Sequence, residues 1–281
     1  MHKVLIIGSN GYIGRPLTNQ LKKKYKLILP SHSSGQIDVL NKKTLARYIK
    51  KDIYLIINLS GQLIEKKSKL KKIILKGNKN IVDLINDVKR DIIYIFISSC
   101  LVYGHKKKLA NENASLNPQN YYARLKFSAE NYIKKNIRRF KILRLANVYD
   151  GSKDRGFFKK LFLSAKEKNK IEFSNLLTQR NMIHLKDATK SIYHIIISKK
   201  LKEQKKVILN VGHENIRLLQ IQKIFSSFFK NRLKIIDKKN SLLKDSSQII
   251  STKKQNKFIK WKKKKISDTL WDILKKNEKF I

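Results

Sequence analysis

The chain has 281 residues and a formal net charge of +45, because 65 Lys plus Arg stand against 20 Asp plus Glu. Its apolar blocks exclude a disordered chain, and no apolar run reaches the roughly 18–20 residues that span a membrane. The single Cys excludes a disulfide scaffold and indicates a reducing compartment, so we expect a cytoplasmic protein with one large domain or a large and a small one.

Six short apolar runs are the strand candidates. Nearly continuous runs of this kind are typical of strands that are buried on both faces of a parallel sheet. The six are Val4–Ile7, Leu27–Leu29, Ile53–Asn58, Ile92–Ile97, Lys141–Leu145 and Val207–Asn210.

Helical patterns lie between these runs, and the alternation predicts an α/β fold with a doubly wound parallel sheet. After residue 148 the pattern loosens. We expect residues 1–148, with about 183–211, to form the larger domain, and residues 149–182 and 212–281, with few strands, to form a smaller C-terminal lobe that binds substrate. The predicted helices are Tyr12–Lys24, Lys42–Lys50, Lys69–Val88, Tyr121–Arg138 and Leu185–Lys199.

A glycine-rich turn follows the first strand. It carries Gly8, Gly11 and Gly14 in the spacing G-x-x-G-x-x-G and leads into a helix, with Tyr12 and Ile13 between the last two glycines. Glycines allow a tight turn and let backbone N–H groups approach a pyrophosphate at a helix N-terminus. The turn therefore predicts a dinucleotide site, with an empty strand–helix turn as the alternative.

The second strand ends without the acidic residue that usually binds an adenosine ribose. The segment reads Leu-Pro-Ser-His-Ser-Ser over residues 29–34. Without an acid there is no repulsion against a 2′-phosphate, and His32 and Ser33 could contact one. This favours NADP over NAD, although a merely variable loop remains the alternative. Asp38, slightly further along, is placed to reach the adenine.

Two features form a candidate catalytic group. Tyr122 and Lys126 are four residues apart on a predicted helix, so they share one face. An ammonium beside a phenol stabilises the phenolate, and a Tyr base near pH 7 needs its pKa lowered by roughly three from its reference value. Ser98 and Ser99 end the fourth strand, where a hydroxyl can hydrogen-bond a reacting carbonyl or hydroxyl.

The glycine turn, the strand-end Ser and the Tyr/Lys pair are far more specific together than separately. In this order and spacing the chain resembles the extended short-chain dehydrogenase/reductases of the NAD-dependent epimerase/dehydratase family, whose members mostly act on nucleotide sugars. The resemblance covers nearly the whole chain. It implies a Rossmann-type fold, NAD or NADP as cofactor, a nucleotide-diphosphate sugar as substrate, and a homodimer formed through paired helices.

The same resemblance assigns roles to individual residues. Ser98 to Gly104 matches S-S-x-x-V-Y-G, which makes Ser99 the catalytic hydroxyl beside Tyr122 and Lys126. Asn147 and Arg180 match the substrate-binding Asn of L-R-x-x-N-V-Y-G and the diphosphate-binding Arg of R-D-F-I-H-V-D-D. The implied cofactor-binding residues are Gly8, Gly11, Tyr12, Ile13, Gly14, Ser33, Asp38, Leu59, Ser60, Gly61, Tyr122 and Lys126.

Several positions depart from the family pattern. Cys100 and Leu101 follow the catalytic hydroxyl, where the sugar 4,6-dehydratases carry acidic residues. Water elimination needs an added acid and base, so the sequence argues against a dehydratase. Cys100 is one place from the catalytic Cys of the fucose synthases, but a buried structural thiol is the favoured interpretation. Ile74 occupies a position where the family often has a cofactor-contacting Asn.

We therefore predict a nucleotide-sugar epimerase or 4-ketosugar reductase that transfers a hydride at a sugar carbon, C4 by expectation. A ketoreductase of non-nucleotide small molecules is one alternative, and a non-catalytic RNA-binding or assembly protein is another. The positive charge is spread along the chain. Lys, Ile and Asn are abundant together, and all three are encoded by A+T-rich codons, so genome composition can explain much of the excess of Lys. A solvated basic surface is thus favoured over a nucleic-acid site, which stays open; no metal site is expected.

Overall fold

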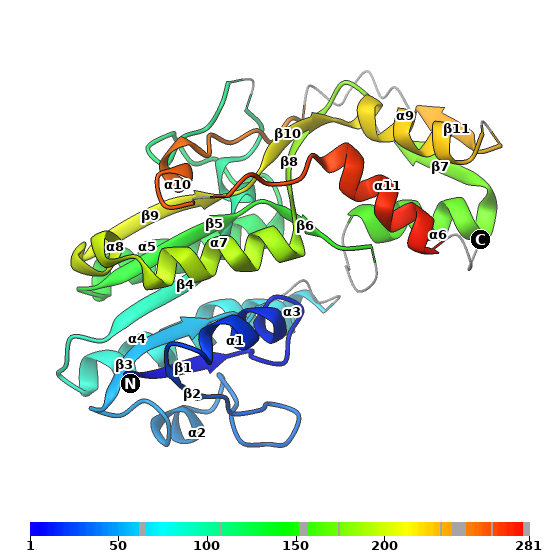
Figure 1. Cartoon of the computed structure of the whole chain (residues 1–281). Helices are drawn as coiled ribbons and strands as arrows, with labels where there is room; N and C mark the ends of the chain where they lie inside the picture. The colour runs from blue at the N-terminus through cyan, green and yellow to red at the C-terminus, as the bar shows by residue number, and fades with distance from the viewer. Residues whose placement is uncertain are drawn as a thin grey trace.

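The computed structural model describes residues 1–61, 66–106, 108–151, 157–173, 175–230, 232–237, 246–259 and 261–277. Some parts of the expected C-terminal lobe, namely 152–156, 174, 231, 238–245, 260 and 278–281, lie outside the described residues. Figure 1 shows a central sheet with helices on both faces and a smaller group of helices and strands at one end.

The central sheet has six parallel strands in the order β2-β1-β3-β4-β5-β9. Each of these strands overlaps one of the six apolar runs of the sequence, with only Leu29 and Ile92 falling just outside, so the predicted α/β fold with a doubly wound sheet is confirmed. The chain leaves β1 toward β2 on one side and β3 on the other, which is the reversal point where such sheets bind ligands. The strands are β1 Lys3–Ile7, β2 Lys26–Ile28, β3 Ile53–Asn58, β4 Ile93–Ser99, β5 Phe140–Leu145 and β9 Lys206–Val211.

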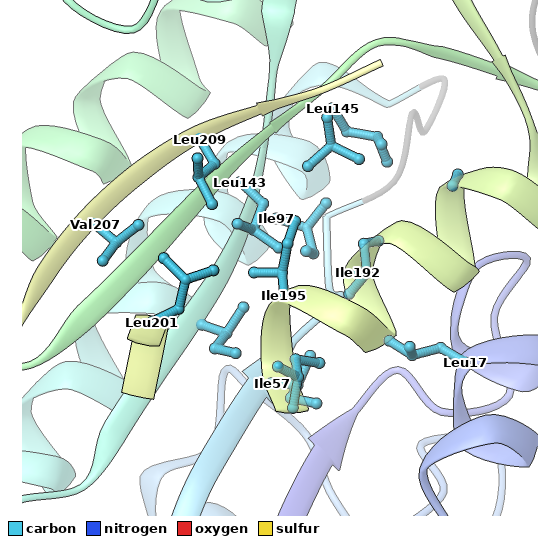
Figure 2. Packing of buried hydrophobic residues seen from close by; sticks show 14 of the residues in the cluster. Leu17, Ile57, Ile97, Leu143, Leu145, Ile192, Ile195, Leu201, Val207 and Leu209 are labelled. Carbon is cyan, nitrogen blue, oxygen red and sulfur yellow. The ribbon is translucent and has the colours of Figure 1, made fainter. Parts of the chain in front are cut away.

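Each face of the sheet has its own hydrophobic core. On one face, Leu17 of α1 (Gly14–Leu21) and Ile192 of α7 (Leu185–Ile197) pack against β3, β4, β5 and β9, as Figure 2 shows. The opposite face is covered by α2 (Lys42–Ala46), α3 (Lys67–Lys71), the π-helix η1 (Lys72–Gly77), α4 (Asn78–Asp87) and α5 (Tyr121–Asn136). The strands are apolar on both sides because both faces are covered.

Two small sheets lie beyond the central one. A three-stranded sheet has the order β10-β8-β6, and β11 pairs with β7 in parallel. A third hydrophobic cluster joins them to helices α6, α9 and α11. The remaining elements are β6 Asn147–Tyr149, α6 Phe157–Lys168, β7 Lys170–Phe173, β8 Gln179–His184, α8 Lys199–Glu203, β10 Glu214–Arg217, α9 Leu218–Phe228, β11 Lys234–Asp237, α10 Lys253–Asn256 and α11 Ile266–Asn277.

The short strands of these two small sheets were not placed by the sequence analysis. The strands β7, β8, β10 and β11 have four to six residues each and mix charged with apolar side chains, as in Lys-Ile-Glu-Phe of β7. They are only partly buried, so they lack the continuous apolar run by which the central strands were predicted.

Candidate active site

The glycine turn has a backbone that only glycine fits. Gly8 has φ +85°, and its carbonyl accepts a hydrogen bond of 3.0 Å from the Gly11 N–H. A Cβ on Gly14 would lie 2.1 Å from the Gly8 oxygen and 2.7 Å from the Ser9 oxygen. The turn is thus folded tightly onto itself at the start of α1, whose first turn holds no acidic residue.

The end of β3 lies directly beside this turn. The Leu59 N–H donates to the Ile7 carbonyl at 3.0 Å, and a Cβ on Gly8 would lie 3.3 Å from Leu59. Ser60 is fixed by hydrogen bonds from its N–H and Oγ to Asn58 Oδ1, at 2.9 and 2.6 Å. The structure therefore brings Gly8, Gly14, Leu59 and Ser60 together at one edge of the sheet. A close-packed glycine turn with a helix N-terminus fits the pyrophosphate of a dinucleotide.

The loop after β2 is an ordered turn rich in hydroxyl groups. Asn10 Nδ2 of the glycine turn donates to Ser31 Oγ at 3.2 Å, and Ser31 Oγ lies 2.8 Å from Ser33 Oγ. Gln36 closes the turn through its N–H to the Ser31 carbonyl at 3.1 Å. Asp38 is half-buried and its Oδ1 accepts from the Leu40 N–H at 2.9 Å. The glycine turn and Ser33 are thus connected through Asn10 and Ser31.

The two serines at the end of β4 have different partners. Ser98 Oγ donates to Glu130 Oε1 at 2.6 Å in the interior. Ser99 caps the short 3-10 helix η2 (Cys100–Tyr103), because its Oγ accepts from the Leu101 N–H at 3.2 Å. Among the described residues, the Ser99 hydroxyl donates to no other group. Of the two, Ser99 therefore retains a proton to offer to a substrate oxygen.

Helix α5 carries Tyr122 and Lys126 on one face. It begins at an N-cap in which Asn120 Oδ1 accepts from the Ala123 N–H at 2.8 Å. Lys126 is buried, and its Nζ donates to the Ile97 carbonyl of β4 at 2.8 Å and lies 5.7 Å from the centre of the Tyr122 ring. The predicted pair is thus docked against the strand that ends in Ser99.

Burial shifts the pKa values of both groups. Tyr122 is partly buried, and the desolvation of its phenol raises its pKa above the usual 10.0, with a further increase from the nearby Cys100. Burial lowers the pKa of Lys126 to about 7, against the attraction of Glu130. The lowered pKa that Tyr122 needs as a base is therefore not a property of the protein side chains alone; a bound positive charge has to supply it.

The neighbours of Cys100 connect Tyr122 to the small sheet. The thiol is buried, and burial raises its pKa to about 12, although the Arg180 guanidinium acts in the opposite direction. Since Cys100 interacts electrostatically with both Tyr122 and Arg180, the three groups lie around one region. Arg180 of β8 donates from Nη1 to the Ser246 carbonyl at 3.1 Å. Asn147 of β6 donates from Nδ2 to the Asn181 carbonyl at 2.9 Å.

A buried ionic network behind the site was missed by the sequence analysis. Glu130 and Arg144 are 0 and 2 % exposed, and Arg144 Nη2 donates to Glu130 Oε2 at 2.8 Å. Arg144 Nη1 also donates to the Tyr103 hydroxyl at 2.9 Å, which in turn donates to Asn210 Oδ1 at 2.7 Å. These hydrogen bonds join α5, β5, η2 and β9. Arg144 lies inside the L-R-x-x-N-V-Y-G motif, but a motif match gives no sign that its side chain meets Glu130.

The described residues contain neither a cluster of metal ligands nor a membrane-spanning helix. Within the ranges that the structure covers, no three His, Cys, Asp or Glu side chains cluster in a way that could hold a metal ion. None of the helices described above is long and apolar enough to cross a membrane.

Solved structures share this fold along their whole length. UDP-glucose 4-epimerase from Thermotoga maritima with UDP-glucose is 16 % identical with a TM-score of 0.80, and the match covers 100 % of this chain and 99 % of the other. A dTDP-4-dehydrorhamnose reductase from Clostridium acetobutylicum is 17 % identical with a TM-score of 0.79 and coverages of 98 and 99 %. RMD from Pseudomonas aeruginosa, complexed with NADPH, is 19 % identical with a TM-score of 0.78 and coverages of 99 and 100 %.

Sequence comparison gives the family. No curated protein matches the chain in sequence. A family model does match, over residues 4–212, which contain the glycine turn, Ser99, Tyr122, Lys126 and Arg180. The chain belongs to the NAD dependent epimerase/dehydratase family.

Proposed function

We propose that the chain is an NAD(P)-dependent nucleotide-sugar oxidoreductase, acting as a 4-ketosugar reductase, with Tyr122 as the proton-transferring residue. The observation that carries the proposal is the docking of α5 against β4. It fixes Lys126 on the Ile97 carbonyl, two residues before Ser99, and places Tyr122 on the same helical face. Membership of the family and the glycine turn beside the end of β3 support it.

Each residue of the catalytic group has a separate task. A bound nicotinamide supplies or accepts the hydride. Tyr122 gives a proton to, or takes one from, the reacting sugar oxygen, while Lys126 stabilises the phenolate by its charge. Ser99 donates its free O–H to the same oxygen.

The loop after β2 supports NADPH as the cofactor. Ser31 and Ser33 present hydroxyls beside the glycine turn, and the described loop contains no acid before Asp38. Asp38 already accepts a hydrogen bond from its own turn. A 2′-phosphate would meet hydroxyl donors at this place, without repulsion from a carboxylate.

The substrate we propose is a nucleotide-diphosphate sugar held between the sheet edge and a lobe formed by residues 149–182 and 212–281. Arg180 supplies a positive charge for the diphosphate, and its electrostatic interaction with Cys100 supports a position near Tyr122. Asn147 pairs with the backbone of β8, the strand that carries Arg180. The larger unit would then be residues 1–148 with about 183–211.

Local features of the site distinguish the proposed reductase from a 4,6-dehydratase and from an epimerase. A 4,6-dehydratase needs an acid and a base beyond Tyr122, and the residues after Ser99 are a neutral buried thiol and Leu101. An epimerase would recycle a retained NAD. The hydroxyl-lined loop supports NADPH instead, a cofactor that a reductase binds and releases in each catalytic cycle. This favours the reductase.

The test begins with small molecules released from the purified, denatured protein, identified by mass spectrometry. We expect no retained NAD, and selective binding of NADPH on titration. Stoichiometric NAD surviving purification would favour an epimerase that recycles its cofactor and would refute the reductase. Failure to bind any dinucleotide would refute both.

The catalytic assignment is tested with 4-ketosugar nucleotides carrying uridine, thymidine, guanosine or cytidine diphosphate. We expect Tyr122→Phe to lower kcat by about 10²–10⁴-fold, the usual contribution of a general acid or base. Tyr121→Phe is the matched control, since it removes the neighbouring hydroxyl on the same helix, and it should keep the activity. Equal activities of the two variants would exclude Tyr122 as the proton-transferring residue.

A further inference from the structure

Ile74 lies on an unusual stretch of helix. The sequence predicted one continuous helix over Lys69–Val88, but residues Lys72–Gly77 form a π-helix between α3 and α4. π-Helical turns are rare and are often found at functional sites. Ile74 is only 2 % exposed, so this turn directs an apolar side chain inward.

Gly61 is the residue that makes room for Ile74. A Cβ on Gly61 would lie 2.7 Å from Ile74 Cγ1 and 3.7 Å from Lys126 Nζ. Gly61 also has φ +88°, a conformation that other residues rarely adopt. Ile74 and Lys126 therefore both lie beside the same glycine, and the bulk at position 74 is matched by the absence of a side chain at position 61.

The Lys126 ammonium has mostly apolar surroundings. It has three N–H donors, and in the described part of the chain its one hydrogen-bond acceptor is the Ile97 carbonyl. The Phe96 ring lies with its centre 4.6 Å from Nζ, and the Tyr122 ring is the next aromatic group. Burial of this kind favours the uncharged amine, which is why the pKa of Lys126 is lowered to about 7.

The charged and titratable groups around Lys126 do not compensate for this burial. Glu130, one turn further along α5, attracts the ammonium, but it is already paired with Arg144 of β5. Cys100 of η2 is held neutral by burial. Tyr94 of β4 donates its hydroxyl proton to Asn78 on α4. On the π-helix itself, the two lysines Lys72 and Lys76 are exposed to solvent.

We propose that Ile74 is a positioning residue which, together with Gly61, keeps Lys126 dry and short of acceptors until a bound dinucleotide provides them, so that cofactor binding brings a proton onto the lysine. This inference rests on the proposed function, because it assigns Lys126 to the dinucleotide site. The proton comes from the buffer, and no bond other than this N–H is formed. The consequence is a dinucleotide affinity that falls as the pH rises above neutrality.

The experiment measures proton uptake directly. NADPH is titrated calorimetrically into the full-length protein near pH 8, in buffers with different ionisation enthalpies. We expect the unsubstituted protein to take up close to one more proton per bound NADPH than Lys126→Met. Near pH 6 the difference should disappear, since the lysine is then protonated before binding. The 2′-phosphate contributes equally to both proteins and cancels.

A matched pair of variants isolates the role of Ile74. Ile74→Val and Ile74→Thr have nearly the same shape, but the second adds a hydroxyl that can accept a hydrogen bond from the ammonium. We expect Ile74→Val to behave like the unsubstituted protein, and Ile74→Thr to lose about half or more of the extra proton uptake near pH 8. Equal uptake by both variants would overturn the role of Ile74.

The outcomes separate this inference from the proposed function. If Lys126→Met abolishes hydride transfer but takes up as many protons as the unsubstituted protein, the inference fails and the proposed function stands. If the unsubstituted protein binds no dinucleotide, the proposed function itself fails. The comparison with Lys126→Met needs no change at position 74, so the inference can be refuted even where Ile74→Thr does not fold.

Discussion

Glu130 and Arg144 form a salt bridge with no access to solvent, with Arg144 Nη2 donating to Glu130 Oε2 at 2.8 Å and Nε to Oε1 at 3.1 Å. Glu130 also accepts from Ser98, which immediately precedes Ser99. The pair therefore connects α5, the helix of Tyr122 and Lys126, to the ends of β4 and β5. It is the fixed frame against which the catalytic residues are placed.

The first prediction concerns the loss of one partner of this pair. Glu130→Gln leaves the guanidinium of Arg144 buried without a counter-charge, and we expect the free energy of unfolding to fall by about 3–5 kcal/mol. Denaturation in urea measures this change. Replacing both partners, as Glu130→Gln with Arg144→Met, should recover a large part of the loss, because no unpaired charge remains.

A surface ion pair is the control for this measurement. Lys42 and Asp87 form a salt bridge of 3.1 Å, with both side chains largely exposed. Asp87→Asn should change the free energy of unfolding by less than about 1 kcal/mol. A loss for Glu130→Gln as small as that for Asp87→Asn would contradict the framing role of the buried pair.

The second prediction compares two glycines of the same turn. A Cβ on Gly14 meets backbone oxygens at 2.1 and 2.7 Å, whereas a Cβ on Gly11 meets one at 3.1 Å. Backbone atoms cannot move aside, so we expect Gly14→Ala to cost about 1–3 kcal/mol in unfolding free energy and to abolish dinucleotide binding. Gly11→Ala should lose less unfolding free energy and should keep part of the dinucleotide binding. Thermal unfolding and titration with NADPH test whether Gly14→Ala is the more damaging of the two variants. A larger effect of Gly11→Ala would refute the close packing described for Gly14.

The central sheet could be predicted from the sequence because each of its strands carries its own apolar run. The strands are buried on both faces, so an apolar run such as Ile53–Asn58 is visible without any knowledge of its partners. The strands of the small sheets were missed for the converse reason. Arg180 and Asn181 in β8 are polar residues of a strand, and their role depends on β6 and β10, which lie far away in the chain.

The site shows the same division. The spacing of Tyr122 and Lys126 predicts a shared helical face, and the structure places them on α5. The partner of Glu130 could not be read from the sequence, because an ion pair between α5 and β5 is a tertiary contact. The π-helical turn around Ile74 was also hidden, since one extra residue in a helical turn leaves no mark in an apolar pattern.

The third prediction follows from the buried lysines. The pKa of Lys126 is about 7 in the folded protein and 10.5 in a solvated chain. The unfolded chain therefore binds more protons than the folded one between these values, so stability rises with pH in this window. Lys126 destabilises the fold fully below pH 7, by an amount on the order of a few kcal/mol, and not at all above pH 10.5.

Lys126→Met removes this titration. We expect the variant to be more stable relative to the unsubstituted protein at pH 7 than at pH 10, as measured by urea denaturation across the range. Lys141→Met is the comparison, because the Lys141 pKa is lowered only to about 8 and its Nζ caps the carbonyl of Leu201. Its pH dependence should therefore be weaker. A difference between Lys126→Met and the parent that does not vary with pH would contradict the dry environment of Lys126.

The last prediction concerns the choice of cofactor. Ser33→Asp places a carboxylate on the hydroxyl-lined turn, next to Ser31 and within reach of the glycine turn through Asn10. A 2′-phosphate would then face a like charge, so we expect the affinity for NADPH to fall about tenfold or more, while the affinity for NADH stays the same or rises. Fluorescence titration with both dinucleotides measures the ratio of the two affinities.

The control is Ser34→Asp, which adds the same charge one residue further along, where the Ser34 hydroxyl donates back to the Ser31 carbonyl at 3.3 Å. The side chain at position 34 is thus directed to the Ser31 carbonyl and not to the Ser31 hydroxyl, so we expect this control to lose less NADPH affinity than Ser33→Asp. If both variants lose NADPH affinity equally, the effect is one of net charge, and the turn does not read the 2′-phosphate.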